Sequence, residues 1–272
     1  ESEASRRAPL RVLAYGDSLT AGLTSFLPSA ANKPRRPYAL ALQLQSPPKP
    51  ASATGAIAYN GVVTPTSAAA TAFARDGALY SHNFLEPYDF DAVRREVRRL
   101  RGKMKKEKDS IAVNRHGCCL DGGSIAHECL TSERTARRLH ALLGDGSLRP
   151  GDYPIEARVY KRGGEMEWHR DDVLYAQPQV ELVLTLENDS DSQTQWVDAA
   201  GTLHAEWTEP NCLLCVRAGA GGALHRVTPA KRGERTILKA VYTTTLERGD
   251  PAAWAHLESF PTARRREKRR RR

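Results

Sequence analysis

Long apolar runs are missing from this sequence. None approaches the roughly 20 residues of a membrane-spanning helix, so we expect no membrane span. Cysteine is also scarce, and the five cysteines lack the spacing of a secreted disulfide framework. The hydrophobic fraction of 40% suffices for one domain of about 150 to 200 residues with appendages. We expect an intracellular, reducing environment, although a targeting segment could precede Glu1, which is not a methionine.

The cysteines fall into two groups. Cys212 and Cys215 have the spacing of a redox or zinc motif, but they lie in an apolar run without a second pair, which predicts strand packing. Cys118, Cys119 and Cys129 lie near two histidines without a recognised ligand spacing. Whether this second group binds metal stays open.

Positive charge is concentrated at one end of the chain. The net charge is +9, and the last nine residues, from Arg264 to Arg272, hold eight basic residues and one glutamate, or +7. Such a block repels itself, which predicts a disordered tail. It would serve as a nuclear import signal, as an anchor on nucleic acid, or only as a solvated end.

The N-terminal part contains a short motif. An apolar segment at residues 10–15 leads into Gly16, Asp17, Ser18 and Leu19, and this resembles the first block of the SGNH (GDSL) hydrolases, which implies Ser18 as a nucleophile. Those enzymes also need an Asp three residues before a His, and none of the eight histidines has one. We interpret residues 1–45 as an SGNH-like fragment in an irregular extension, and an esterase using Ser18 remains the alternative function.

Composition divides the rest of the chain. Residues 46–76 are rich in Pro, Ala, Ser and Thr, which predicts a linker. Residues 80–144 should be mostly helical, with helices near 89–106 and 132–143, the second ended by Gly144. Alternation at residues 111–113 hints at a strand.

Beyond Gly151 the spacing of the apolar residues changes from the 3.6-residue period of a helix to the two-residue alternation of a strand. Strands are expected around residues 155–159, 180–186, 195–197, 202–207, 212–217, 224–228 and 236–244. This order predicts an α+β domain at 77–247, in which helices support a double-stranded β-helix, or jelly roll, at 153–247. Residues 248–272 would form the tail.

Four residues within the strand-rich part point to metal chemistry. His169 and Asp171 are two apart on an extended segment, so they project the same way and can chelate one ion, with His225 supplied by a facing strand. Two imidazoles and one carboxylate suit Fe(II) with open positions, whereas a closed zinc site wants a fourth protein ligand or thiolates. Arg235, ten residues after His225, could clamp a carboxylate with two parallel hydrogen bonds.

The segment 160–242 resembles the iron(II) and 2-oxoglutarate-dependent dioxygenases in these residues. The resemblance implies His169, Asp171 and His225 as metal ligands and Arg235 as the residue that binds 2-oxoglutarate. Tyr160 resembles a tyrosine of the prolyl 4-hydroxylase branch that helps to bind the co-substrate, although Met166 replaces that branch's second tyrosine. O2 would be consumed, succinate and CO2 released, and ascorbate would support turnover.

The resemblance implies hydroxylation of a carbon in a protein side chain or a small molecule. The carboxylate of Asp171 fills a site that related halogenases leave to chloride, which favours oxygenation. A nucleic-acid demethylase is an alternative, but it usually carries a second arginine soon after Arg235, and here Lys239 alone is basic up to residue 245. Lys239 lies on the same strand face as Arg235 and would either line the pocket or meet solvent.

Overall fold

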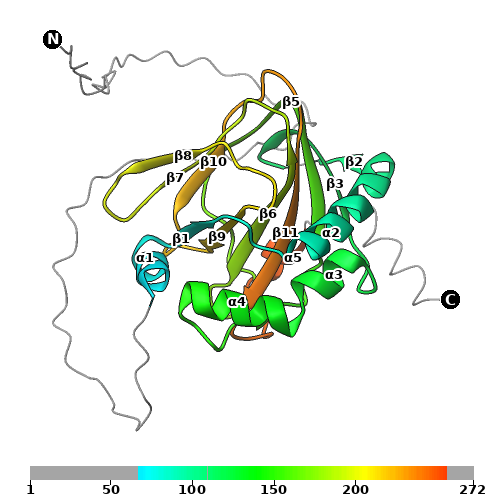
Figure 1. Ribbon diagram of the computed structural model, residues 1–272. Coiled ribbons are helices and arrows are strands. Elements are labelled where there is room, and N and C mark those ends of the chain that lie inside the picture. Colours follow the sequence, from blue (N-terminus) through cyan, green and yellow to red (C-terminus); the bar gives the residue numbers. More distant parts are fainter. Residues whose placement is uncertain (1–66, 109, 256–272) are drawn as a thin grey trace, which may run out of the picture. The chain divides into compact units, whose positions relative to one another are not determined.

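Residues 67–108 and 110–255 are described by a computed structural model (Figure 1). The motif at Ser18, the segment 46–66 and the basic end from Arg264 to Arg272 lie outside these residues, so the predictions made for them stay predictions. None of the described helices is both long and apolar enough to cross a membrane.

Helices and short strands alternate up to Leu143, and the chain from Arg149 to Thr243 contains strands alone, as the change of period predicts for that part. In order, the elements are α1 (Ala68–Asp76), β1 (Ala78–Ser81), α2 (Pro87–Leu100), the 3-10 turn η1 (Arg101–Lys103), β2 (Lys105–Lys106), β3 (Ala112–Cys119), α3 (Ile125–Leu130), α4 (Glu133–Leu143), β4 (Arg149–Pro150), β5 (Glu156–His169), β6 (Val180–Asn188), β7 (Thr194–Val197), β8 (Leu203–Glu206), β9 (Leu213–Arg217), β10 (Leu224–Val227), β11 (Arg235–Thr243) and α5 (Pro251–Ala255).

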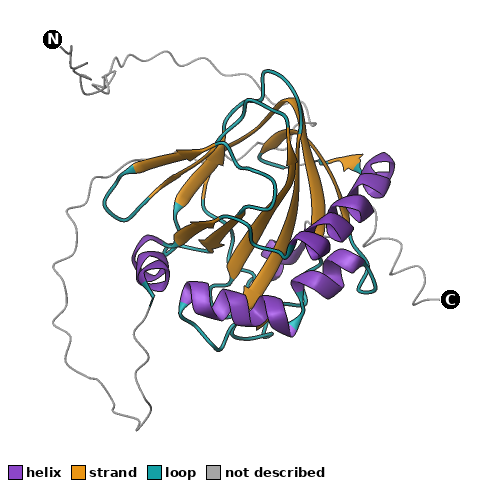
Figure 2. Ribbon diagram, in the orientation of Figure 1, coloured by secondary structure: helices purple, strands orange, loops and turns teal. Residues whose placement is uncertain are grey.

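The strands pair in the order β1-β9-β6-β11-β5-β10-β7-β8, with β3 also on β5, and every pairing is antiparallel. The long strand β5 belongs to both halves of this path: its first part pairs with β11 and its last residue with β10 (Figure 2). The sheet curls until Tyr80 on β1 meets Trp196 on β7, with ring centroids 6.1 Å apart. The predicted jelly roll is confirmed.

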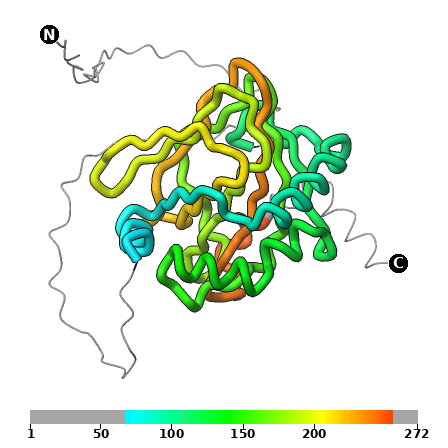
Figure 3. Tube along the Cα trace, in the orientation of Figure 1, coloured from blue at the N-terminus to red at the C-terminus, as the bar shows by residue number. Residues whose placement is uncertain are grey.

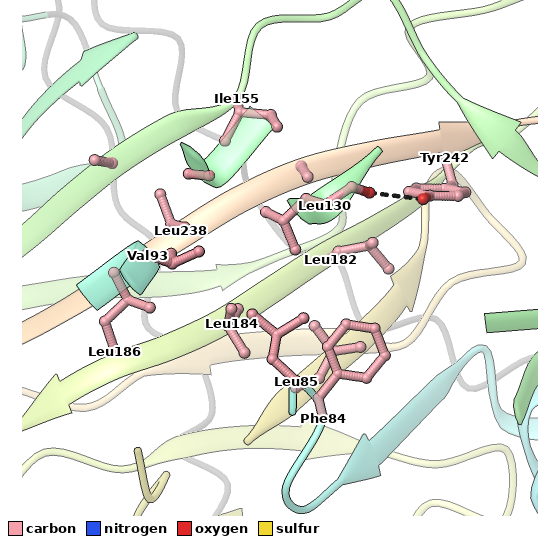
Figure 4. Close-up of a cluster of buried hydrophobic side chains, with 14 of the residues drawn as sticks. Phe84, Leu85, Val93, Leu130, Ile155, Leu182, Leu184, Leu186, Leu238 and Tyr242 are labelled. Atoms are coloured by element: carbon pink, nitrogen blue, oxygen red, sulfur yellow. Dashed lines mark hydrogen bonds between the residues drawn. The ribbon is translucent and has the colours of Figure 1, made fainter. Parts of the chain in front are cut away.

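Alternation along the strands separates two interiors. Leu182 and Leu184 on β6 and Leu238 on β11 pack against Val93 and Leu130 of the helices (Figure 4). The residues between them, such as Val183 and Ile237, cluster with Tyr160 inside the curled sheet. One strand face therefore supports the helices, and the other lines the space in which the site lies.

The helical predictions need two corrections. The helix expected up to residue 106 ends at Leu100, because the chain turns through η1 and buries Met104 in an extended conformation before β2 pairs with β3. The last nine residues of the expected linker form α1, whose Ser67 caps the first turn and whose Phe73 is buried. The second predicted helix is confirmed as α4, with Gly144 at a φ of 72°.

The segment expected to be mostly helical also contains β1 and β3. β3 pairs with β5 along most of its length, and its last residues, Cys118 and Cys119, are both buried. The strand hinted at by the alternation at residues 111–113 is confirmed as β3, but its length was not predicted, because residues 117–119 are all buried and the alternation is lost there.

Candidate metal centre

His169, Asp171 and His225 come together inside the jelly roll. His169 ends β5, His225 lies on β10, and the two are direct partners in the antiparallel ladder, with ring centroids 4.1 Å apart. Asp171 follows β5, and its carboxylate oxygens lie 3.8 Å from His169 Nε2 and 3.5 Å from His225 Nε2. His225 thus comes from the neighbouring strand and not from a facing one, so backbone pairing sets the spacing of the two imidazoles.

Backbone carbonyls orient both imidazoles. The carbonyl of Glu167 lies 2.8 Å from His169 Nδ1, and that of Ala223 lies 3.1 Å from His225 Nδ1. A neutral imidazole whose Nδ1 donates to a carbonyl presents an unprotonated Nε2 to a metal. Both Nε2 atoms face Asp171, so all three residues offer lone pairs to one point.

The charge states of the three residues favour a cation. Burial, followed by the neighbouring His225, lowers the pKa of His169 to about 4. Burial alone would raise the pKa of Asp171, but His225, Lys239 and His169 hold it below its usual value. Near neutral pH the centre therefore holds a carboxylate and an uncharged His169, which are the forms that bind metal.

The turn that carries Asp171 is fixed from two sides. Gly219 donates its N–H to the carbonyl of Asp171 over 2.9 Å. The fully buried Gln179 side chain donates to the carbonyl of Asp172 over 2.8 Å and accepts the N–H of Leu174 over 3.0 Å. Asp171 is consequently held in place by hydrogen bonds that do not depend on a bound ion.

Arg235 is buried without a carboxylate partner among the described residues. It is 1% exposed, Nη1 donates to Thr194 Oγ1 over 2.6 Å, and Nε has no hydrogen-bond partner. Burial lowers its pKa from the usual value, yet a guanidinium stays protonated. A buried cation without an anion is costly, which favours an anionic ligand at this place.

Tyr160 lies opposite Arg235 in the ladder between β5 and β11 and is also 1% exposed. Its hydroxyl accepts a hydrogen bond from Arg115 Nη1 over 2.9 Å, and Arg115 is held by Glu107 Oε2 over 2.6 Å. Sequence reasoning missed Arg115 and Glu107, because both lie outside the short alternation at residues 111–113 that hinted at β3.

Lys239 lies inside the jelly roll, where it forms a buried ion pair with Glu181, and it does not face solvent. Burial, and then the charge of Asp171, raises the pKa of Glu181 to about 7. Sequence reasoning also missed Glu181, although a glutamate between Val180 and Leu182 on an otherwise buried strand is a usable signal.

The donor set fits Fe(II). It offers two imidazoles and one carboxylate, with no thiolate, and leaves positions for other ligands. Within the described ranges, one other group of potential ligand atoms lies within 4.8 Å of one another, and it consists of His82, Glu209 and Cys212. Cys118, Cys119 and Cys129 belong to neither group, and Cys215 is fully buried in β9, consistent with strand packing.

No family model matches the chain, and no curated protein matches its sequence. Solved structures with a similar fold include a prolyl-4-hydroxylase from Pseudomonas putida, at 22% identity and a TM-score of 0.53, covering 67% of this chain and 98% of that one. A prolyl hydroxylase from Trichoplax adhaerens, in complex with a hypoxia inducible factor peptide fragment, has 16% identity and a TM-score of 0.52, covering 65% and 87%.

A third similar structure is SnoN, a non-heme alpha-ketoglutarate-dependent epimerase from nogalamycin biosynthesis, at 15% identity and a TM-score of 0.53. The similar region covers 64% of this chain and 81% of the SnoN chain. At these identities the similarity establishes that this chain shares its fold with the two prolyl hydroxylases and with SnoN.

Proposed function

We propose that this chain is a dioxygenase that uses Fe(II) and 2-oxoglutarate to hydroxylate a substrate carbon. In the balanced reaction a C–H bond, 2-oxoglutarate and O2 give an alcohol, succinate and CO2. The observation that carries the proposal is that the candidate metal ligands and a buried arginine lie in the same interior of the jelly roll. Three metal-binding residues converge there, and the buried Arg235 has no carboxylate partner within the described residues.

The strand pairing relates Arg235 to the metal centre. Arg235 contacts Thr194 on β7, and Trp196, two residues further along the same strand, is the ladder partner of His225. Two residues of a strand span about 7 Å. A five-carbon diacid has about this length, so it could reach the metal with its keto acid end while its far carboxylate pairs with the guanidinium.

Each residue then has a defined task. When bound, Fe(II) and the keto acid would supply the chemistry of O2 activation and oxidative decarboxylation. His169, Asp171 and His225 would hold the ion, and Arg235 would bind the far carboxylate with two parallel hydrogen bonds. Arg115 donates to the Tyr160 hydroxyl, which itself donates to Met166 Sδ over 3.6 Å. Because a thioether is a weak acceptor, the hydroxyl would turn to the same carboxylate when the co-substrate binds.

Two features refine the reaction. The carboxylate of Asp171 would be a ligand of the ion together with the two imidazoles, which supports oxygenation over halogenation. We propose a protein side chain or a small molecule as substrate, since prolyl hydroxylases and an epimerase from nogalamycin biosynthesis share the fold. A mass-spectrometric search for the gain of one oxygen in peptide libraries and cell extract would separate these classes.

The test measures succinate formed from 2-oxoglutarate by the purified chain with iron, with and without ascorbate. His169→Ala and His225→Ala should abolish it, because each removes an imidazole ligand. His127→Ala, on α3, is the matched control and should keep the wild-type rate. Succinate formation that survives both ligand substitutions would refute the proposal.

A further inference from the structure

A second group of potential ligands lies where β1 meets β9, and we call it the β1–β9 cluster. It consists of His82, Glu209 and Cys212. His82 directly follows β1 and Cys212 directly precedes β9, while Ser81 and Leu213 are partners in the ladder between them. Figure 3 follows the chain through these two strands, which pair along their length. Strand pairing therefore brings together side chains that lie 130 residues apart in the sequence.

The distances in the cluster match those around one tetrahedral ion. His82 Nδ1 lies 3.3 Å from Cys212 Sγ and 3.7 Å from Glu209 Oε2, and all three ligand atoms lie within 4.8 Å of one another. Zinc bonds of about 2.3 Å to sulfur and about 2.0 Å to nitrogen or oxygen place neighbouring ligand atoms roughly 3.3 to 3.6 Å apart. Small rotations of exposed side chains would close the remaining difference.

The arrangement is unlike that of a nucleophilic relay. In a relay the thiol and the carboxylate contact opposite nitrogens of the imidazole, so that a proton passes through the ring. Here Cys212 and Glu209 both contact Nδ1 of His82, so the three donors converge on a point. Burial also raises the pKa of the Cys212 thiol, which argues against a reactive thiolate without a cation.

The backbone around the cluster is fixed independently of any ion. Asn83 and Asn211 adopt left-handed conformations, with φ of 50° and 65°, which turn the chain sharply beside His82 and Cys212. The side chain of Asn211 accepts the N–H of Leu85 and donates to its carbonyl, both over 2.8 Å. The two segments that carry the ligands are therefore locked together, which lowers the cost of ordering a site.

We propose that His82, Glu209 and Cys212 bind one Zn²⁺, with water as the fourth ligand, and that the ion pins β1 to β9. His82 and Glu209 are 60% and 61% exposed at their side chains, so an ion can enter and water can complete the tetrahedron. The thiolate distinguishes this cluster from the centre at His169, which has no sulfur ligand. The soft thiolate favours zinc in the β1–β9 cluster, and the harder imidazole and carboxylate ligands favour Fe(II) at His169.

Cobalt substitution of the full chain tests the proposal. Co²⁺ bound to a thiolate gives a sulfur-to-metal charge-transfer band in the near ultraviolet, which the centre at His169 cannot produce. In a His225→Ala background, which weakens the other centre, the band should saturate at one equivalent, and it should disappear in Cys212→Ser and be displaced by Zn²⁺. Cys129→Ser, which changes a half-buried cysteine on α3, is the matched control and should keep the band.

A second variant keeps the test decisive if Cys212→Ser unfolds the chain, because Cys212 is buried. His82→Ala combined with Glu209→Gln alters two exposed side chains, should fold, and should lose at least ~10-fold in Co²⁺ affinity. The rise in Tm with Zn²⁺ should shrink as well. Absence of the band in the wild type, or an unchanged Co²⁺ affinity in the double variant, would overturn the proposal without touching the proposed dioxygenase activity.

Discussion

At the scale of single residues, Arg235 and Arg158 show that the effect of burying an arginine depends on whether it has a carboxylate partner. Both guanidinium groups are buried, but Arg158 pairs with Glu156 over 2.7 Å, whereas Arg235 donates to the hydroxyl of Thr194 and has no carboxylate partner in the described part of the chain. A paired buried arginine supports the fold, and an unpaired one costs stability. We interpret that cost at Arg235 as the basis of co-substrate binding.

Arg235→Gln should therefore weaken binding without weakening the fold. Loss of charge-assisted hydrogen bonds, each about 1.5 to 3 kcal/mol, should raise the KM for 2-oxoglutarate at least ~10-fold. Tm should stay unchanged or rise, because an unpaired buried charge is removed. Succinate kinetics and thermal unfolding measure the two effects.

Arg158→Gln is the control for that experiment. It leaves Glu156 buried beside a neutral amide, so unfolding should become easier by about 3 kcal/mol or more. If Arg235→Gln destabilised the chain as much as Arg158→Gln, the interpretation of Arg235 as a ligand-binding group would be wrong.

At the scale of elements, the predictable parts are those with a local signal. The alternation in β6 and β11 predicts these strands closely, and the order of His169, Asp171, His225 and Arg235 predicts a site. Arg115, Glu107 and Glu181 could not be assigned in the same way. Their tasks depend on partners from other strands, and strand pairing is not encoded in local periodicity.

The bend in β5 is the element on which the site depends. Its first part pairs with β11 and its end with β10, and the change occurs around Gly163 and Gly164. Gly163 has a φ of 77°, and a Cβ on Gly164 would come 2.6 Å from the carbonyl oxygen of Lys161. Glycine is required at this bend because the backbone itself leaves no room.

Gly164→Ala should shift the end of β5 and with it His169. We expect a loss of about 1 to 3 kcal/mol in the free energy of unfolding, the usual cost of overpacking, together with lower succinate turnover. Gly102→Ala is the matched control, since a Cβ there meets nothing within 4 Å, and it should leave both measurements unchanged. A Gly164→Ala chain with wild-type stability and activity would contradict this account of the bend.

At the scale of the molecule, the jelly roll divides its buried groups by chemistry. The face toward the helices is apolar, while the inner space holds Arg235, Asp171, Lys239 and Glu181. Lys239 and Glu181 form a buried pair, and Lys239 is also among the charges that lower the pKa of Asp171. The charged side chains of this interior, which come from several strands, therefore stabilise one another as a group and not only in isolated pairs.

A double-mutant cycle tests this balance. Lys239→Met leaves Glu181 buried without its cation. Because the pKa of Glu181 is already raised to about 7, its carboxyl should then be protonated near neutral pH, and the loss in chemical denaturation should be about 1 to 3 kcal/mol and grow as the pH rises. Adding Glu181→Gln removes the ionisable group and should restore most of that loss. Strictly additive effects of the two substitutions would show that the pair is not coupled.

The central claim is that one interior binds Fe(II) and 2-oxoglutarate together, and an anaerobic titration followed by visible absorbance tests it most directly. An Fe(II) chelate of a keto acid has a metal-to-ligand charge-transfer band that needs neither substrate nor turnover. The wild-type chain should develop this band at one iron per chain, His225→Ala should not, and Arg235→Gln should need at least ~10-fold more 2-oxoglutarate. A wild-type chain without the band, or a band that His225→Ala leaves intact, would contradict the account.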